Sequence, residues 1–304
     1  MYIYWIIGWP IKHSLSPAMH NAAFKHLCID AEYRAFEIRP EELEDFILNR
    51  KDVIGFNITI PYKIKAREIL EKRFPLDEKY FKNRYYIQVT GAVNTVKRNG
   101  DKLEYVNTDV EGFVRSIEAD LKFKLGDGAN KNKNVLLIGC GGAGRAVIAG
   151  LSLDFVDTDI NKIYVFDKSE TAINATKEHF GRLHKEWAGN LNNIVEFISE
   201  KNIREIIDHC QLLVNASPLG MEEGDTSPIS KELLHKDLFV YDVVYNRETQ
   251  LVKDAKIKEC KRAVTGKGML LYQGVGAFEF WFPSVRPRPV STMRKALDSA
   301  LNKK

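Results

Sequence analysis

The chain of 304 residues contains little cysteine. Cys28, Cys140, Cys210 and Cys260 stand apart, and no two of them form a CxxC pair. This spacing argues against a zinc ribbon, a redox-active dithiol motif and a disulfide framework. Isolated thiols are typical of a reducing compartment, so we expect a cytoplasmic protein. Because the cysteines lack the spacing of metal ligands, we also expect no metal ion.

Long apolar runs and an excess of one charge are also missing. No run approaches the roughly 18 residues that cross a bilayer, so we expect no membrane span. The opening segment, MYIYWIIGWPIKHSLSP, lacks a basic leader and a cleavage site, and we interpret it as a buried strand rather than a signal peptide. The 45 basic and 41 acidic residues leave a net charge of +4. That balance favours a small-molecule ligand over nucleic acid.

The chain divides into two blocks at a polar stretch, residues 122–134 (KFKLGDGANKNKN), which is typical of a linker. In the first block Ser16 is expected to cap a helix, and Asn99-Gly100 indicates a type I′ hairpin between strands. The apolar patterns predict strands at 3–7, 33–38, 53–60, 92–97 and 102–106, and helices at 17–28, 40–50 and 109–121.

The second block alternates short apolar runs with helical stretches, which predicts a doubly wound parallel sheet. We therefore expect an α/β protein with an N-terminal substrate domain and a Rossmann domain. The substrate domain would comprise residues 1–115 with the C-terminal helices 270–304, and the Rossmann domain residues 116–269. The patterns predict strands at 134–139, 162–166, 212–215, 238–243 and 262–265, and helices at 142–153, 268–282 and 290–301.

A glycine-rich turn of the form GxGxxG follows the first buried strand of the second block and opens a helix. In that context the first glycine permits a tight turn, the second lets the backbone approach a pyrophosphate, and the third packs the helix on the strand. We therefore expect a dinucleotide to bind at Gly139, Gly141, Gly142, Ala143 and Gly144.

Asp167 ends the next predicted strand, roughly 20 residues after the glycines, where an acidic residue commonly accepts hydrogen bonds from the adenine ribose. A carboxylate at this point repels the 2′-phosphate of NADP, whereas the adjacent Lys168 attracts it. We expect NAD as the cofactor in preference to NADP.

Polar clusters in the first block lie where strands end, which is where an open α/β sheet binds its ligands. The hydroxyls of Ser14 and Ser16, beside a helix N-terminus, suit a carboxylate. Asn57 and Thr59 alternate along one strand, so both are expected on the substrate face. Lys63 and Asp109 form a candidate pair for moving a proton to or from a substrate hydroxyl.

Eight ordered motifs together resemble the shikimate/quinate dehydrogenase family over nearly the whole chain. They are PIKHSLSPAMHN (10–21), NITIPYK (57–63), GAVNT (91–95), NTD (107–109), GCGGAGRA (139–146), NASPLG (215–220), DVVY (242–245) and GKGMLLYQGVGAF (266–278).

The resemblance implies reversible oxidation of the 3-hydroxyl of shikimate, with hydride passing to the nicotinamide. By the same resemblance Lys63 is the catalytic acid or base, Asp109 pairs with it, and Ser14 and Ser16 bind the substrate carboxylate. Further implied positions are Thr59, Asn94, Tyr245 and Gln273 at the substrate, and Asn215, Val243 and Gly266 at the cofactor.

The sequence departs from the family pattern at Asp167-Lys168-Ser169, where NADP-dependent members carry Asn-Arg-Ser or Asn-Arg-Thr. This resembles the NAD-using quinate/shikimate branch. Two alternatives stay open: a dehydrogenase that prefers quinate or aminoshikimate, and a non-catalytic sensor of shikimate-type ligands. The oligomeric state also stays open, with a homodimer as one alternative to a monomer.

Overall fold

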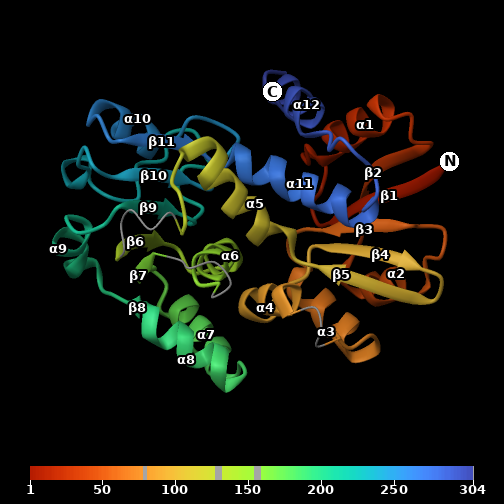
Figure 1. Cartoon of the computed structure of the whole chain (residues 1–304), viewed down its shortest axis with the longest axis horizontal. Helices are drawn as coiled ribbons and strands as arrows, with labels where there is room; N and C mark the ends of the chain where they lie inside the picture. Colours follow the sequence, from red (N-terminus) through yellow and green to blue (C-terminus); the bar gives the residue numbers. More distant parts are fainter. Residues whose placement is uncertain (78–80, 127–131, 154–158, 304) are drawn as a thin grey trace. The chain divides into compact units, whose positions relative to one another are not determined.

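The computed structural model describes residues 1–77, 81–126, 132–153 and 159–303 (Figure 1). It forms two compact units: Met1–Gly112 with Leu271–Lys304, and Phe113–Leu270. The chain leaves the first unit within α5 (Thr108–Ser116) and returns within α11 (Lys267–Trp281). Across the described ranges, no helix is long and apolar enough to span a membrane, and no cluster of acidic, His and Cys side chains has the makings of a metal site.

The first unit is built on a five-stranded sheet with the order β2-β1-β3-β4-β5. The first three strands are parallel, whereas β4 and β5 form an antiparallel hairpin beside β3. The strands are β1 (Tyr2–Gly8), β2 (Ala31–Glu37), β3 (Gly55–Ile58), β4 (Thr95–Asn99) and β5 (Lys102–Val106).

The strand register brings the ends of several strands to one edge of this sheet. Ile7 near the end of β1 pairs with Ile58 at the end of β3. Asn57 pairs with Thr95, which opens β4, and Thr95 pairs with Val106, which closes β5. The loops that leave β1, β3 and β5, and the loop that enters β4, therefore all lie at this edge.

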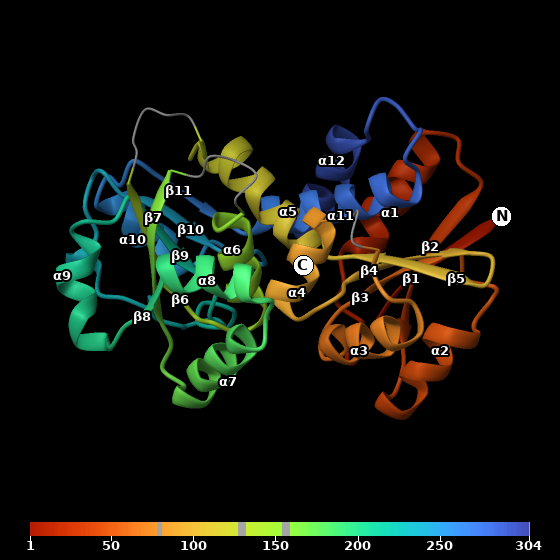
Figure 2. The same cartoon turned by 60° about the horizontal axis from the view of Figure 1, so that its bottom comes forward.

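Helices cover both faces of the first sheet; in Figure 2, α1, α11 and α12 lie on one side and α2 and α3 on the other. On the first side α1 packs on α12 and β2, and Trp281 Nε1 donates to Val96 O at 2.9 Å. On the other side Phe46, Leu70 and Phe56 belong to one buried cluster. The helices are α1 (Ser16–His26), α2 (Leu43–Asn49), α3 (Lys63–Arg73), α4 (Phe81–Thr90) and α12 (Val290–Leu301).

The second unit has a six-stranded sheet with the order β11-β10-β9-β6-β7-β8, in which every pairing is parallel. This confirms the predicted doubly wound sheet. Its strands are β6 (Lys133–Ile138), β7 (Ile160–Phe166), β8 (Val195–Phe197), β9 (Leu212–Asn215), β10 (Phe239–Asp242) and β11 (Arg262–Thr265). Its helices are α6 (Gly142–Leu151), α7 (Glu170–Gly181), α8 (Lys185–Ile194), α9 (Ile203–Ile207) and α10 (Gln250–Ile257).

The predicted N-cap at Ser16 is wrong. Ser16 is the first residue of α1, Leu15 precedes it as N-cap, and no side chain caps the helix from there. Instead the Ser14 hydroxyl accepts the Ser16 N–H at 3.3 Å. The Ser16 amide in the first turn of α1 is thus hydrogen-bonded to a side chain two residues upstream. Local bonds of this kind, from a hydroxyl to the backbone, compete with ordinary N-capping.

The hairpin is present, but its predicted turn type is wrong. Asn99 pairs with Lys102, so the two loop residues are Gly100 and Asp101. Gly100 has φ +62° and Asp101 does not have a positive φ. A type I′ turn needs positive φ at both loop residues, whereas glycine at the first alone is the pattern of type II′. The predicted linker at 122–134 lies partly outside the described residues, and β6 includes its last two residues.

Candidate active site

An ion pair between Lys63 and Asp109 occupies the edge of the first sheet where β3 and β5 end. β3 ends at Ile58 and Lys63 opens α3, while Asp109 lies in the first turn of α5. Lys63 Nζ is 2.6 Å from Asp109 Oδ2, and the side chains are 28% and 18% exposed. The pair is therefore ordered by its surroundings yet open to a ligand.

Two asparagines hold the aspartate in place. Asn94 Nδ2 donates to Asp109 Oδ1 at 2.8 Å, and Asn94 Oδ1 accepts the Thr108 N–H at 2.8 Å. Asn107 Oδ1 accepts the Asp109 N–H at 3.0 Å. Because Asn94 engages one carboxylate oxygen, the other is directed at Lys63.

Ser14, Ser16 and Thr59 lie on the loops that leave the same sheet edge. Ser16 is 4% exposed, whereas Ser14 and Thr59 are half-buried. The Thr59 N–H donates to Ile7 O at 2.9 Å, which fixes the chain beyond β3 against β1. The unit thus gathers hydroxyls and an ammonium–carboxylate pair at one edge.

Asn57 does not have the free amide expected of a substrate contact. It is 4% exposed, and its Nδ2 donates to Asn94 O at 3.1 Å and to Thr95 Oγ1 at 2.9 Å. Its Oδ1 accepts from Tyr33 OH at 2.7 Å. With both amide hydrogens donated to the protein, Asn57 orders the sheet edge. The sequence analysis missed Tyr33, although a buried tyrosine usually needs a partner for its hydroxyl.

His20 lies fully buried under Tyr33, with the two rings stacked at a centroid distance of 4.3 Å. Neither of its ring nitrogens has a hydrogen-bond partner among the described residues. Burial lowers the pKa of His20 from its usual value to about 3. The imidazole is therefore neutral in the folded protein at neutral pH.

We predict that His20 makes the protein acid-sensitive. Because its pKa is lower in the folded chain, the unfolded chain binds more protons between pH 6.5 and 3, so the free energy of unfolding falls as pH falls. Relative to a His20→Phe variant, wild type should lose about 3 kcal/mol between pH 7 and pH 4, at ~1.4 kcal/mol per pKa unit. Denaturant titrations across this range measure the difference, and parallel curves would contradict it.

The glycine turn of the second unit is closely packed at two of its glycines and open at two others. Gly139 has φ +95°, and a Cβ there would lie 2.7 Å from Ser217 N. A Cβ on Gly144 would lie 2.1 Å from Gly139 O, so only glycine lets α6 pack this closely. Above Gly141 and Gly142 the space is open to 4 Å, and α6 begins there without a side-chain cap. Backbone amides at this turn are thus accessible to an anion.

Asp167 is oriented by the same turn. Its Oδ2 accepts the Cys140 N–H at 2.9 Å, and its Oδ1 accepts the Ser169 N–H at 2.8 Å. The neighbouring Lys168 is exposed. A half-buried carboxylate therefore stands at the end of β7, beside the glycines.

Asn215, predicted at the cofactor, is fully buried, and its side-chain amide is engaged within the protein. Its Nδ2 donates to Asp242 Oδ1 and to Leu219 O, both at 3.0 Å. Asp242 Oδ2 also accepts from Thr249 Oγ1 at 2.6 Å, and burial raises the pKa of Asp242 to about 6. These contacts tie together the loops that follow β9 and β10.

Val243 and Gly266 are brought into direct backbone contact, since a Cβ on Gly266 would lie 2.0 Å from Val243 O. Tyr245 lies two residues further along the same loop and is 37% exposed. Gln273 lies on α11 in the first unit, where the next residue, Gly274, packs on Met19 of α1.

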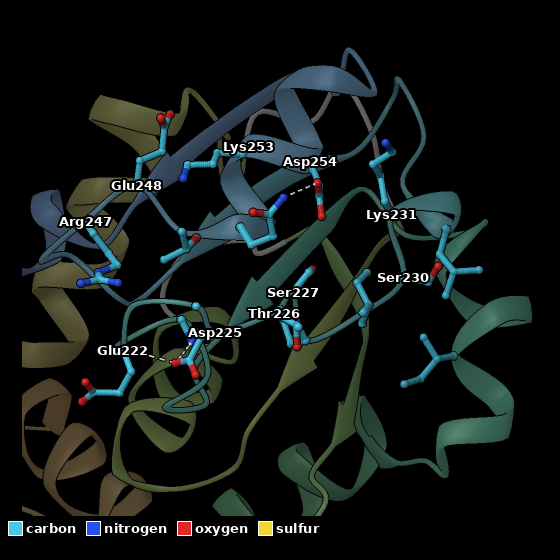
Figure 3. A pocket seen from close by; sticks show the side chains of 18 of the residues that line it. Glu222, Asp225, Thr226, Ser227, Ser230, Lys231, Arg247, Glu248, Lys253 and Asp254 are labelled. Atoms are coloured by element: carbon cyan, nitrogen blue, oxygen red, sulfur yellow. Dashed lines mark hydrogen bonds between the residues drawn. The ribbon is translucent and has the colours of Figure 1, made fainter.

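A polar groove of about 1280 Å³ lies elsewhere on the second unit, between the 220–231 loop, the start of α9 and the start of α10 (Figure 3). Charges of both signs line it, among them Lys201, Lys253, Glu222 and Glu248. None of the residues predicted to bind cofactor or substrate contributes to its lining. The groove therefore does not correspond to either predicted site.

A parallel doubly wound unit with a glycine turn and an acidic residue after its second strand is a Rossmann-type dinucleotide-binding unit. In this chain the Rossmann-type unit is joined to a second α/β unit that carries a Lys–Asp pair. This combination is typical of two-domain oxidoreductases that use a nicotinamide dinucleotide.

Comparison with known proteins narrows the class to one family. Residues 6–96 match the family described as the shikimate dehydrogenase substrate binding domain. Shikimate dehydrogenase (NADP(+)) of Methanopyrus kandleri is 36% identical over 297 residues, which cover 96% of this chain and 93% of that protein. The chain belongs to the shikimate dehydrogenase family, as the eight sequence motifs predict.

Solved structures of two relatives resemble this chain over nearly its whole length. Shikimate 5-dehydrogenase from Listeria monocytogenes, in complex with shikimate and NAD, superposes with a TM-score of 0.78 at 28% identity, covering 98% of this chain and 96% of that one. Quinate dehydrogenase from Corynebacterium glutamicum, in complex with NAD, gives a TM-score of 0.78 at 28% identity, covering 98% and 99%.

Proposed function

We propose that this protein catalyses the reversible oxidation of the 3-hydroxyl of shikimate to the ketone of 3-dehydroshikimate, with a nicotinamide dinucleotide as hydride carrier. The observation that carries the proposal is the ion pair of Lys63 and Asp109, at 2.6 Å, on a sheet edge that also holds serine and threonine hydroxyls. The relative from Methanopyrus kandleri bears the name of this activity.

The substrate carboxylate would bind to the hydroxyls of Ser14 and Ser16, next to the N-terminus of α1. Hydrogen bonds to an ionised carboxylate are about twice as strong as neutral ones, so these two groups would fix one end of the ring. Further substrate contacts are proposed for Thr59, Asn94, Tyr245 and Gln273.

Lys63 would carry the proton. In the direction of reduction its ammonium donates a proton to the carbonyl oxygen as that oxygen becomes a hydroxyl, and in oxidation the neutral amine takes the proton back. Asp109 stabilises the ammonium and, through its second oxygen bonded to Asn94, keeps it in one orientation. Positioning of this kind lowers the barrier because the proton acceptor is already in place.

The second unit would bind the dinucleotide. The pyrophosphate would occupy the open space above Gly141 and Gly142, and the ribose hydroxyls would bind the carboxylate of Asp167. Val243 and Gly266 would lie at the nicotinamide. When bound, this cofactor supplies hydride acceptance and donation.

The experiment that tests the proposal is a steady-state assay of purified protein with shikimate and with quinate, each with NAD and with NADP. Shikimate-dependent formation of reduced nicotinamide is the expected result. A much higher kcat/KM for quinate would identify a quinate dehydrogenase instead. Binding of shikimate without turnover would indicate a sensor and contradict the proposal.

We also propose that NAD is preferred to NADP, because the Asp167 carboxylate would face the 2′-phosphate. The relatives from Methanopyrus kandleri and Methanocaldococcus jannaschii are named for NADP(+), so this is a departure from them. Replacing Asp167 by Asn should raise kcat/KM for NADP by about tenfold and lower it for NAD, since one repulsive charge is removed. A Lys168→Ala variant serves as the control and should weaken only NADP. Wild-type protein that uses NADP better than NAD would contradict the proposal.

A further inference from the structure

We propose that Asp242 is a positioning residue for the nicotinamide end of the dinucleotide, because its carboxylate joins the two loops on which that end would lie. The inference rests on the proposed function, which places Val243 and Gly266 at the nicotinamide. It gives a role to a buried acidic group that neither the proton transfer nor the binding of the adenosine half uses.

The strand order of the second unit indicates which loops would face the nicotinamide. β6 lies between β7 and β9, so the glycine turn has Asp167 on one side and the 216–220 loop on the other. A Cβ on Gly139 would lie 2.7 Å from Ser217 N, so this loop contacts the turn itself. A dinucleotide extends across the carboxyl ends of such strands. With its adenosine at Asp167 and its pyrophosphate at the turn, its nicotinamide end would lie over the loops that follow β9 and β10.

The carboxylate of Asp242 lies at the base of both loops. Asp242 is the last residue of β10 and is fully buried. Its Oδ1 accepts from the Val244 N–H at 3.1 Å and from Asn215 Nδ2 at 3.0 Å. Its Oδ2 accepts from Thr249 Oγ1 at 2.6 Å. No cation pairs with it in the part of the chain that the structure describes, so these three donors take the place of a counter-ion.

Asn215 extends the network into the 216–220 loop. Its Nδ2 also donates to Leu219 O at 3.0 Å, so both hydrogens of its amide are engaged. Its Oδ1 accepts from the Ser217 N–H at 3.1 Å and from Ser217 Oγ at 2.7 Å. The carboxylate of Asp242 therefore orients the amide, and the amide orients the loop beside the glycine turn.

The 243–249 loop is held near both of its ends by the same carboxylate. Val244 near its start and Thr249 at its end both donate to Asp242, and Thr249 is also the N-cap of α10. A Cβ on Gly220 would lie 3.1 Å from Thr249 Cγ2, so the two loops also pack against each other. Val243 lies inside the segment that these bonds fix.

Loss of the carboxylate should therefore disturb the nicotinamide end and leave the adenosine end in place. Three buried donors on the two loops would lose their acceptor, which favours a different arrangement of both loops. The N–H groups of Cys140 and Ser169 that orient Asp167 belong to other segments and keep their bonds. A ligand without nicotinamide should bind as before, whereas hydride transfer, which depends on orientation, should slow.

The test compares two ligands of the same site. Calorimetry measures Kd for NAD and for ADP-ribose, which lacks the nicotinamide, and steady-state assays with shikimate measure kcat. We expect Asp242→Ala to raise the Kd of NAD about tenfold, to change that of ADP-ribose less than about twofold, and to lower kcat about tenfold or more. If wild type binds NADP more tightly, NADP and 2′-phospho-ADP-ribose are used instead. Equal weakening of both ligands, or unchanged binding of the dinucleotide together with unchanged kcat, would overturn the inference.

Two further variants serve as controls. In Asp242→Asn the side-chain oxygen still accepts from Val244 and Asn215, so Kd and kcat should recover to within about threefold of wild type. Asp254→Ala is the matched control, since Asp254 is also a buried acidic residue of this unit, 7% exposed, and accepts from Gln250 Nε2 at 2.8 Å. It should keep the wild-type Kd and kcat. A loss in Asp254→Ala as large as that in Asp242→Ala would overturn the inference.

If Asp242→Ala does not fold, two variants of Thr249 ask the same question. Valine has a similar volume but removes the donor to Asp242, whereas serine keeps it. Thr249→Val should raise the Kd of NAD about threefold or more and leave that of ADP-ribose unchanged, and Thr249→Ser should bind both as wild type does. Equal effects of valine and serine overturn the inference.

The outcomes for wild type separate the inference from the proposed function. Wild-type protein that binds no dinucleotide overturns both. Wild type that binds NAD but does not oxidise shikimate overturns the proposed reaction, and the two Kd values then decide the inference. Wild type that oxidises shikimate beside an unaffected Asp242→Ala overturns the inference alone.

Discussion

Replacing Lys63 by alanine is expected to lower kcat by about 10² to 10⁴-fold and to change the KM for shikimate only a few-fold. A positioned acid or base contributes rate enhancement of about this size, because it acts in the transition state. Lys63 meets the geometric requirement: its ammonium lies 2.6 Å from Asp109 Oδ2, and its side chain is 28% exposed. Steady-state kinetics in both directions measure the change.

Lys65→Ala is the matched control for this loss. Lys65 lies on the same helix two residues further on, is 65% exposed and pairs with Glu68 at 3.0 Å. An exposed pair of this kind contributes little, so the variant should behave as wild type. If Lys63→Ala loses kcat/KM through a higher KM alone, Lys63 binds substrate and the proton is carried by another group.

Replacing Gly144 by alanine is expected to destabilise the second unit and to weaken dinucleotide binding about 10²-fold. The added Cβ would lie 2.1 Å from Gly139 O, which is backbone and cannot turn away. The start of α6 must therefore move from the turn. Overpacking of this kind costs about 1–3 kcal/mol, and a misplacement of about 1 Å can cost 10²-fold in function. Denaturant unfolding and cofactor titration measure the two effects.

Two other glycines serve as controls that distinguish a loss of packing from a loss of space for the dinucleotide. Gly181, at the end of α7, has open space where a Cβ would lie, with nothing within 4 Å, and Gly181→Ala should leave stability and binding unchanged. Gly142 is equally open, but a pyrophosphate would occupy that space. Gly142→Ala should fold normally and bind the dinucleotide less tightly. A Gly144→Ala protein with wild-type stability and affinity would contradict the proposed packing role.

Much of the fold is predictable because its signals are local. The run Val135–Leu137 lies on a strand buried on both faces, and the glycine turn follows it directly. The Lys63–Asp109 pair is also accessible to sequence reasoning. Both residues follow predicted strands, and β3 and β5, each antiparallel to the β4 strand between them, end at the same edge of the sheet.

The contacts that sequence analysis missed are the long-range ones. Nothing near Tyr33 in the chain indicates that its hydroxyl meets Asn57, since that contact depends on the order β2-β1-β3 and on the tilt of one ring. The protein partners of the Asn57 and Asn215 amides were missed for the same reason. Their motifs give the residue type, whereas the partners that engage the amides, such as Asp242, come from other strands.

The hairpin of β4 and β5 has its turn at one end and its catalytic neighbours at the other. Thr95 and Val106 pair beside Asn94 and Asn107, while Gly100 and Asp101 close the far end. Five residues of strand, at ~3.4 Å each, separate the two ends by about 17 Å. A fluorophore, affinity tag or inserted peptide attached at this tip would therefore lie far from the Lys63–Asp109 pair and leave it undisturbed. One residue added inside β4, in contrast, would turn its side chains to the opposite face.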